Sequence, residues 1–216
     1  MRSDIVLVCI GLTGSAFAIG NADTTAVCTY LENKYSSYFA WDPLSANGIK
    51  DLTNATVYTD INAVYWNAAN SLLRACCAFF PANAAMVSDA VQQLNKYPNA
   101  NFALKSGGHQ PAPGFSATDG GVMISFEPNM ASTVRSDDGK HFFVGPGARW
   151  GDAYKVTGET NQVVVGGRLG HIGVGGFVLG GGLSFYSAQY VSSLERASTT
   201  IKLIKSGPCM RQCRRD

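Results

Sequence analysis

Two glycine-rich turns carry the residues of this sequence most able to do chemistry. The first is Lys105-Ser106-Gly107-Gly108-His109, after a short apolar run, and the second is Gly173-Val174-Gly175-Gly176. Glycine lets backbone N–H groups approach an anion closely, so such turns suit a pyrophosphate. Two turns of this kind, far apart in the chain, predict a large nucleotide held between two subdomains.

Neither turn matches the common nucleotide-binding fingerprints. After Gly173 and Gly175, the Rossmann pattern requires glycine or alanine where this chain has Val178, and the turn is not the first βα turn. No Gly-Lys-Ser/Thr occurs, so an ATP-binding P-loop is absent. The nucleotide site must therefore be of another type.

The three histidines leave alternatives open. His109 follows the first two glycines and is either a cofactor residue or an ordinary turn residue. His171 lies in the second glycine cluster and either lines a ligand pocket or faces water, whereas His141 opens a strand and is expected to face solvent. No Ser-His-Asp or Cys-His order is recognisable, which weakens a hydrolase reading and leaves the catalytic residues unassigned. No metal site is expected, because Cys209 and Cys213 have no His or Asp at ligand spacing.

The first turn is expected at the end of a βαβ unit. Ala75–Phe80 is a short apolar strand, and Asn83 is expected to cap the helix that follows. Asn101–Ser106 is the next strand and runs into the turn. A strand, a helix and a strand within about thirty residues predict parallel strands. The apolar residues of the helix recur at helical spacing: Met86, Val87, Ala90, Val91 and Leu94.

The second turn follows a different pattern of elements. Gly121–Phe126 and Lys140–Gly145 are predicted strands, joined through a polar turn at residues 136–139 into a hairpin. Arg149–Gly158 is a predicted helix, and Gln162–Val165 is a strand that runs into the glycine cluster. Near the N-terminus, Thr25–Tyr35 is a predicted helix followed by extended chain. The expected fold class is α+β, with two α/β subdomains meeting at glycine-rich loops.

Composition indicates a globular protein of ordinary domain size. The chain has 216 residues, 46% hydrophobic and 15% charged, which excludes a disordered protein. Its net charge of +2 is uneven: residues 1–190 carry 11 Lys and Arg against 13 Asp and Glu, and residues 191–216 carry 6 against 2. Because residues 1–190 carry no excess of basic residues, the sequence does not favour nucleic-acid binding.

Residues 1–18 have the pattern of a secretory signal peptide. Arg2 precedes an apolar stretch, and Ala16-Phe17-Ala18 supplies a small-x-small cleavage pattern. The stretch is shorter than the about 20 residues needed to span a bilayer, so no membrane anchor is expected. We therefore expect a secreted protein, with residues 19–60 as an N-terminal segment.

Secretion implies an oxidising compartment, in which Cys28 is expected to pair with Cys76 or Cys77. The latter two are adjacent and point to opposite sides of a strand, so only one of them is expected to take the bond. Asn54-Ala55-Thr56 is an N-glycosylation sequon, a weak signal on its own.

Several motifs, in order, resemble the FAD-binding domain of berberine-bridge-enzyme-like oxidases. These are covalent flavoproteins of the vanillyl-alcohol-oxidase, or PCMH, type. The likeness covers roughly residues 60–190. Its motifs are Lys105–His109, Gly114 and Ser116, Gly121–Ile124, Val144–Ala148 with Trp150-Gly151, and Gly166–Gly182.

The resemblance implies a bound FAD whose ring methyl group is covalently attached to His109. Ser106, Gly107, Gly108 and Gly173–Gly176 would hold the pyrophosphate and ribityl parts. Members with a second covalent link have a cysteine where this chain has Leu169, so a single histidyl link is expected. Such a link would fix the flavin and raise its reduction potential. The expected cofactor-binding set is Lys105, Ser106, Gly107, Gly108, His109, Gly114, Ser116, Gly170, His171, Gly173, Val174, Gly175 and Gly176.

The resemblance also sets the expected domains. Residues 61–190 would be a PCMH-type FAD-binding domain that is incomplete at its C-terminus, with the substrate domain missing. Residues 191–216 would be an unrelated basic tail, produced by an unspliced intron, a shifted reading frame or a natural truncation, or else a genuine tail for a partner.

Two functions of different class follow. The first is a secreted FAD-linked oxidase that takes a hydride from an alcohol, sugar or alkaloid-like carbon to flavin N5 and passes the electrons to dioxygen. The second is a non-catalytic remnant that binds FAD weakly or not at all, because the missing strands leave an exposed sheet edge. The expected partners are a small-molecule substrate and dioxygen, with no nucleic acid and no membrane.

Overall fold

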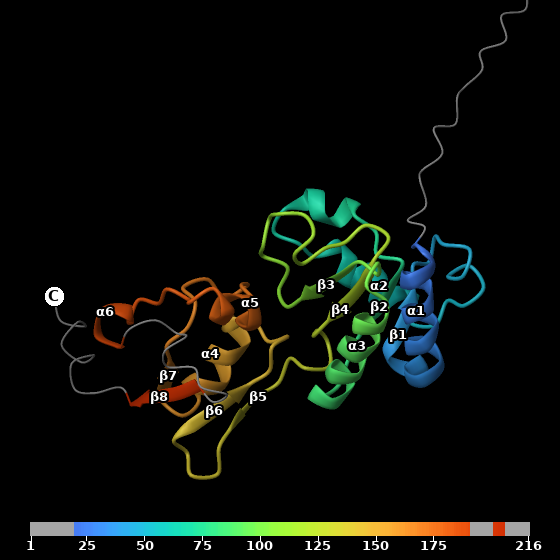
Figure 1. Ribbon diagram of the computed structural model, residues 1–216. Coiled ribbons are helices and arrows are strands. Elements are labelled where there is room, and N and C mark those ends of the chain that lie inside the picture. Colours follow the sequence, from blue (N-terminus) through green and yellow to red (C-terminus); the bar gives the residue numbers. More distant parts are fainter. Residues whose placement is uncertain (1–19, 191–200, 206–216) are drawn as a thin grey trace, which may run out of the picture.

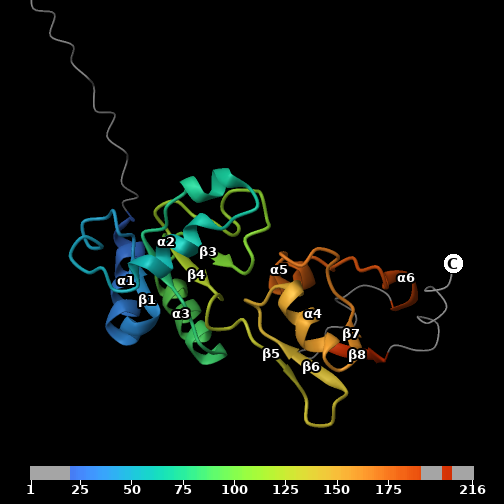
Figure 2. The same ribbon diagram turned by 180° about the vertical axis from the view of Figure 1, so that it is seen from behind.

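The computed structural model describes residues 20–190 and 201–205, which form two four-stranded sheets side by side (Figures 1 and 2). The expected signal peptide, residues 1–18, lies outside the described residues. Helices cover both sheets, so the α+β class and the two subdomains are confirmed.

The first sheet has the strand order β1-β2-β4-β3. Its strands β2 and β3 both run parallel to β4, and β1 pairs antiparallel with β2. All four residues of β4 are buried, as expected of a strand with neighbours on both sides. The bounds are β1 (Phe39–Trp41), β2 (Cys77–Phe79), β3 (Phe102–Lys105) and β4 (Val122–Ser125).

Helices pack on both faces of this sheet. On one face, α1 (Ala22–Tyr35) and α3 (Ala84–Lys96) bury Val27, Leu31 and Leu94 against alternate strand residues. On the other face, α2 (Ala55–Ala63) buries Tyr58 and Ile61. Two short 3-10 helices complete this half, η1 (Ser36–Tyr38) and η2 (Ala68–Leu72).

The second sheet is antiparallel, in the order β5-β6-β8-β7. Its helices α4 and α5 enclose a core that contains Phe142, Trp150 and Val164. The bounds are β5 (Thr133–Arg135), β6 (His141–Val144), α4 (Trp150–Gly158), β7 (Gln162–Val164), α5 (Val174–Leu179), α6 (Ser187–Tyr190) and β8 (Ile201–Lys205). Strand β8 belongs to the segment expected as an unrelated tail, yet it lies between β6 and β7.

Most of the predicted elements are present. The parallel β2 and β3 joined through α3 confirm the βαβ unit, although β4 lies between the two strands. Asn83 caps α3, since its Oδ1 accepts a hydrogen bond of 3.0 Å from the backbone N–H of Met86. Residues Met86, Ala90 and Leu94 of the predicted stripe are buried, whereas Val91 is exposed.

Two predictions were wrong. The strand at 121–126 does not form a hairpin with that at 140–145, because β4 pairs in the first sheet and β6 takes the short strand β5 as its partner. The chain after residue 35 is not simply extended, since α2 forms there. Packing of Tyr58 and Ile61, three positions apart on one helical face, outweighs the β-branched composition of that segment.

The disulfide joins Cys28 in α1 to Cys77 in β2, with a Cα–Cα distance of 6.0 Å. Cys76 is a free, buried thiol. The structure thus selects one of the two pairings that the sequence left open. At the sequon, Asn54 Nδ2, the atom that would carry a glycan, donates to the carbonyl oxygen of Phe39 at 2.9 Å and is partly buried. Its geometry gives glycosylation at this position no support.

Candidate functional site

The first glycine loop, residues 106–109, leaves the carboxyl end of β3 at the side of the sheet that faces α5 (Figure 1). Gly108 has a φ of +68°, and a Cβ there would lie 2.8 Å from the carbonyl oxygen of Val64, so only glycine fits without strain. The carbonyl of Gly108 accepts a hydrogen bond from the Trp66 N–H at 3.0 Å. These contacts hold the loop in one conformation.

Lys105, immediately before this loop, points away from it. Its fully buried ammonium donates to the carbonyl oxygen of Ile61 at 2.8 Å and lies 4.7 Å from the ring centre of Tyr65. Burial lowers the pKa of Lys105 to about 8, and the charge of Glu127 opposes that shift. The side chain therefore packs beneath the loop, with its Cε 3.1 Å from the Cβ position of Gly108.

The second glycine loop, residues 170–176, follows β7 and includes the first three residues of α5. It is fixed to the start of α4. The Gly151 N–H donates to the carbonyl of Gly170 at 2.8 Å, and the Val174 N–H donates to the carbonyl of Ala148 at 2.8 Å. Arg149 and Gly173 form an antiparallel bridge. The loop is thus held by backbone hydrogen bonds at both of its ends.

The two glycine loops are in direct backbone contact. A Cβ on Gly107 would lie 2.7 Å from the Cα of Gly173, and a Cβ on Gly173 would overlap the nitrogen of Gly107. Ser106 adds a third contact, because a Cβ on Gly173 would lie 2.5 Å from its Oγ. The same Oγ donates to the carbonyl of Pro146, before α4, at 2.6 Å. The close approach explains why glycine is needed on both sides, and it brings together the two turns that the sequence singled out.

Several backbone amides at this junction have no protein acceptor. Within residues 20–190 and 201–205, the N–H groups of Gly107, Gly108 and His109 donate to no protein acceptor. The N-terminus of α5 has no side-chain cap, and a Cβ on Gly176 would meet nothing within 4 Å. Backbone amides without a protein acceptor can donate hydrogen bonds to a phosphate-containing group, and the open space at Gly176 leaves room near them.

His109 is partly exposed at the edge of this junction. Its ring lies between those of Trp66 and His171, with ring centres 5.4 Å and 5.5 Å away. Burial, together with the charge of His171, lowers the pKa of His109 below its usual value. The imidazole is therefore neutral at neutral pH, which leaves one ring nitrogen able to act as a nucleophile.

Gly114 and Ser116 lie in the turn that follows His109. Gly114 is exposed with a φ of +85° and has open space at its Cβ position. Ser116 is buried, and its Oγ donates to the carbonyl of Gln110 at 3.3 Å. These residues shape the segment that follows His109.

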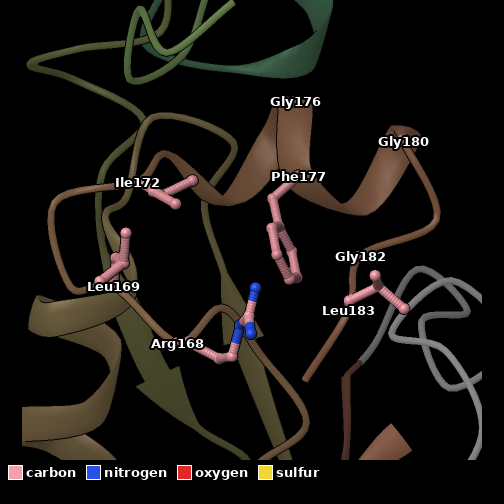
Figure 3. A pocket seen from close by; sticks show the side chains of 8 residues that line it. All are labelled: Arg168, Leu169, Ile172, Gly176, Phe177, Gly180, Gly182 and Leu183. Atoms are coloured by element: carbon pink, nitrogen blue, oxygen red, sulfur yellow. The ribbon is translucent and has the colours of Figure 1, made fainter. Parts of the chain in front are cut away.

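A groove of about 370 Å³ opens beside the second glycine loop (Figure 3). Figure 3 shows the Arg168 guanidinium extending toward Phe177, with Leu183 beside them in the groove. Arg168 was not among the residues predicted from the sequence. Its only signal there is its position within the glycine cluster at residues 166–182. The lining residues are Arg168, Leu169, Ile172, Gly176, Phe177, Gly180, Gly182 and Leu183.

These features fit FAD. Amides without a protein acceptor, from two loops, suit a pyrophosphate. The apolar groove, with the cation of Arg168, suits the flat and charged parts of a dinucleotide. His109 lies at the edge of the junction between the loops. In the part of the chain that the structure describes, no helix is long and apolar enough to cross a membrane. No group of three or more His, Cys, Asp or Glu able to hold a metal occurs in that part either.

Fold and site define a dinucleotide-binding protein of two α/β subdomains that is neither Rossmann nor P-loop. The family described as "FAD binding domain" matches residues 75–198, more than half of the chain. The protein therefore belongs to this FAD-binding family. The match extends past residue 190, where the resemblance read from the sequence ended. The boundaries of the expected domains stay a prediction.

Relatives by sequence are larger flavoproteins. An uncharacterized FAD-linked oxidoreductase of Arthroderma benhamiae is 43% identical over 148 residues, 68% of this chain and 29% of that protein. An FAD-dependent monooxygenase of Fusarium proliferatum is 35% identical over 159 residues, 72% of this chain and 28% of that protein. The chain thus spans less than a third of the length of these curated relatives.

Solved structures share the fold. Glucooligosaccharide oxidase from Acremonium strictum superposes with a TM-score of 0.60 at 20% identity, covering 78% of this chain and 33% of that one. 6-Hydroxy-D-nicotine oxidase from Arthrobacter nicotinovorans gives a TM-score of 0.58 at 22% identity, covering 72% and 31%. The fold is that of the berberine-bridge-enzyme-like, vanillyl-alcohol-oxidase-type flavoproteins, as the sequence motifs predicted.

Proposed function

We propose that this chain is the cofactor-holding part of a secreted FAD-linked oxidase, with the flavin covalently attached through His109. The observation that carries the proposal is the contact of Gly107 with Gly173, because it joins two loops whose backbone amides lack a protein acceptor, one of them next to His109. Membership of the FAD-binding family supports FAD as the cofactor.

Each group at the junction has a role in this proposal. The amides of Gly107, Gly108 and the first turn of α5 bind the pyrophosphate and ribityl parts, which need hydrogen-bond donors. His109 would carry the ring methyl carbon on one imidazole nitrogen. Forming that bond would break one methyl C–H bond and the imidazole N–H bond and release two protons and two electrons, and dioxygen would be the final acceptor of the electrons. Leu169, in place of a cysteine, leaves the link single.

Bound FAD would supply hydride acceptance at N5 and electron transfer to dioxygen, oxidising an alcohol, sugar or alkaloid-like carbon. Neighbours in fold support that range, since they include oxidases of glucooligosaccharides, chitooligosaccharides and 6-hydroxy-D-nicotine. The catalytic base has no assignment within the described residues.

Secretion is part of the same proposal. The Cys28–Cys77 disulfide is a bond that persists in oxidising compartments, and residues 1–18 have the pattern of a signal peptide. Expression with export through a secretory pathway is therefore the suitable source of protein for the tests below.

Acid precipitation of the purified chain tests the proposal. The expected result is a yellow pellet that retains its flavin, and His109→Ala gives a pellet without colour. A colourless protein that takes up no FAD contradicts the proposal. Retained flavin without hydrogen peroxide production, over a panel of alcohols, sugars and alkaloids, favours the non-catalytic alternative for this chain.

A further inference from the structure

We propose that Arg149 is a positioning residue that locks the two glycine loops at the separation required for the dinucleotide. The consequence for flavin binding rests on the proposed function, whereas the lock itself is a property of the protein alone. Arg149 stands at the start of α4, in the second half of the molecule, and its guanidinium contacts three other segments.

The first contact is an ion pair with Glu127, in the loop that follows β4. Arg149 Nε donates to Glu127 Oε1 at 2.9 Å, and Nη2 donates to Oε2 at 3.1 Å. Both side chains are only about one-fifth exposed, at 22% and 21%. A two-point pair of this geometry is directional and fixes the plane of the guanidinium.

The remaining guanidinium nitrogen faces the glycine loops. Arg149 Nη1 donates to the carbonyl of His171 at 2.6 Å and to the carbonyl of Gly107 at a longer 3.4 Å. One side chain thus hydrogen-bonds to both loops beside the Gly107–Gly173 contact. Because Glu127 fixes the guanidinium, the positions of the two carbonyls become coupled to each other.

Arginine suits this task better than lysine. Three separate acceptors require several N–H donors in a rigid arrangement, and an ammonium on a flexible stem does not provide them. The nearby pair Lys155–Asp152 differs, because it is exposed on the surface of α4 and touches neither loop. Asp152→Asn is therefore the matched control on the same helix.

Amide hydrogen exchange of the full chain without FAD tests the lock. Arg149→Met should raise exchange about tenfold or more at the amides of Trp66, Trp150 and Val174. The first two donate to carbonyls of the glycine loops, and the third lies in the second loop and donates to the carbonyl of Ala148. The amides in β4 should keep their protection, and Asp152→Asn should change neither group. Glu127→Gln should give the same pattern with a smaller amplitude. Unchanged exchange at the loop amides in Arg149→Met overturns the proposal, and so does an equal increase throughout β4.

A charge-swapped variant, Glu127→Arg with Arg149→Glu, tests whether the loops need the hydrogen bonds from Arg149 or only a pair of opposite charges. It retains opposite charges but places a carboxylate opposite the loop carbonyls, so the loop amides should still exchange fast. Restored protection overturns the proposal. FAD retention is measured in parallel, and Arg149→Met should lose it. If the wild-type chain takes up no FAD while the exchange pattern holds, the proposed function fails and the lock stands. If the wild type and Arg149→Met retain FAD equally, the flavin part of the inference is overturned.

Discussion

Among the single residues of the site, His109 must be deprotonated for flavin to attach. Its position between Trp66 and His171 keeps it partly buried, and the pKa of His109 is lowered first by burial and then by the charge of His171. The neutral form is the nucleophile, so attachment of flavin should switch on as the pH rises through this lowered pKa.

His171→Gln tests this dependence. The substitution removes the positive charge that disfavours protonation of His109, so the pKa of His109 rises toward its ordinary value. Neutral His109 is then present only at higher pH, and the midpoint of the attachment rate against pH should move upward. The rate is followed by acid-stable flavin formed from apoprotein and FAD. A midpoint that moves downward, or not at all, would show that His171 does not act on His109 electrostatically.

At the scale of elements, two glycines of the second loop are constrained for different reasons. Gly173 is needed because its neighbour Gly107 leaves no room, whereas Gly176 has open space and is free to be larger in the protein alone. The first constraint comes from the fold and the second from the proposed ligand.

Two alanine variants separate these constraints. Gly173→Ala should lower the free energy of unfolding by about 1–3 kcal/mol, because the new Cβ overlaps the Gly107 backbone. Gly176→Ala should leave that free energy unchanged or raise it by up to about 1 kcal/mol, since alanine favours a helix. Yet Gly176→Ala should weaken FAD uptake. Urea denaturation of the apoprotein and FAD titration provide the two readouts, and equal stability losses in both variants would contradict this assignment.

The sequence predicted those elements whose local signals agree with their packing. Asn83 and the spaced apolar residues after it define α3 from sequence alone, and the glycine turns indicated where a nucleotide binds. The hairpin prediction failed because a polar turn flanked by two apolar runs does not reveal which sheet each run joins. The β5 strand, Thr133–Arg135, is three residues long and mostly exposed, so it has no apolar pattern to detect.

The role of Arg149 could not be predicted from the sequence either. Its partners Glu127, Gly107 and His171 lie 22 to 42 positions away, and no spacing rule relates them. Lys105 was predicted to bind the cofactor because it precedes the glycines. Only the three-dimensional structure shows its ammonium turned toward Ile61.

At the scale of the whole molecule, the site lies where two separately built cores meet. The first core is tied to the N-terminal helix by the disulfide between Cys28 and Cys77, 49 positions apart. The second core contains β8, which pairs with both β6 and β7. Each core must therefore be intact before the loops can lie at the right distance from each other.

Cys28→Ala should destabilise the chain strongly. Loss of a cross-link closing a loop of 49 residues is expected to cost roughly 4 kcal/mol of unfolding free energy. Cys76→Ala, which removes a neighbouring buried thiol outside the bond, should cost only about 1 kcal/mol. Denaturation curves with and without reductant compare the two. A reductant that shifts the curve of Cys28→Ala as much as that of the wild type would contradict the assignment of the bond.

Peptide mass mapping can locate the residue that carries the flavin. Trypsin releases Ser106–Arg135 from the full-length protein, and this peptide contains His109 but neither His141 nor His171. After purification with FAD, we expect the peptide to carry the added mass of one FAD, and fragmentation to assign that mass to His109. An unmodified Ser106–Arg135 peptide from protein that nevertheless holds FAD, or FAD attached at another residue, would contradict it.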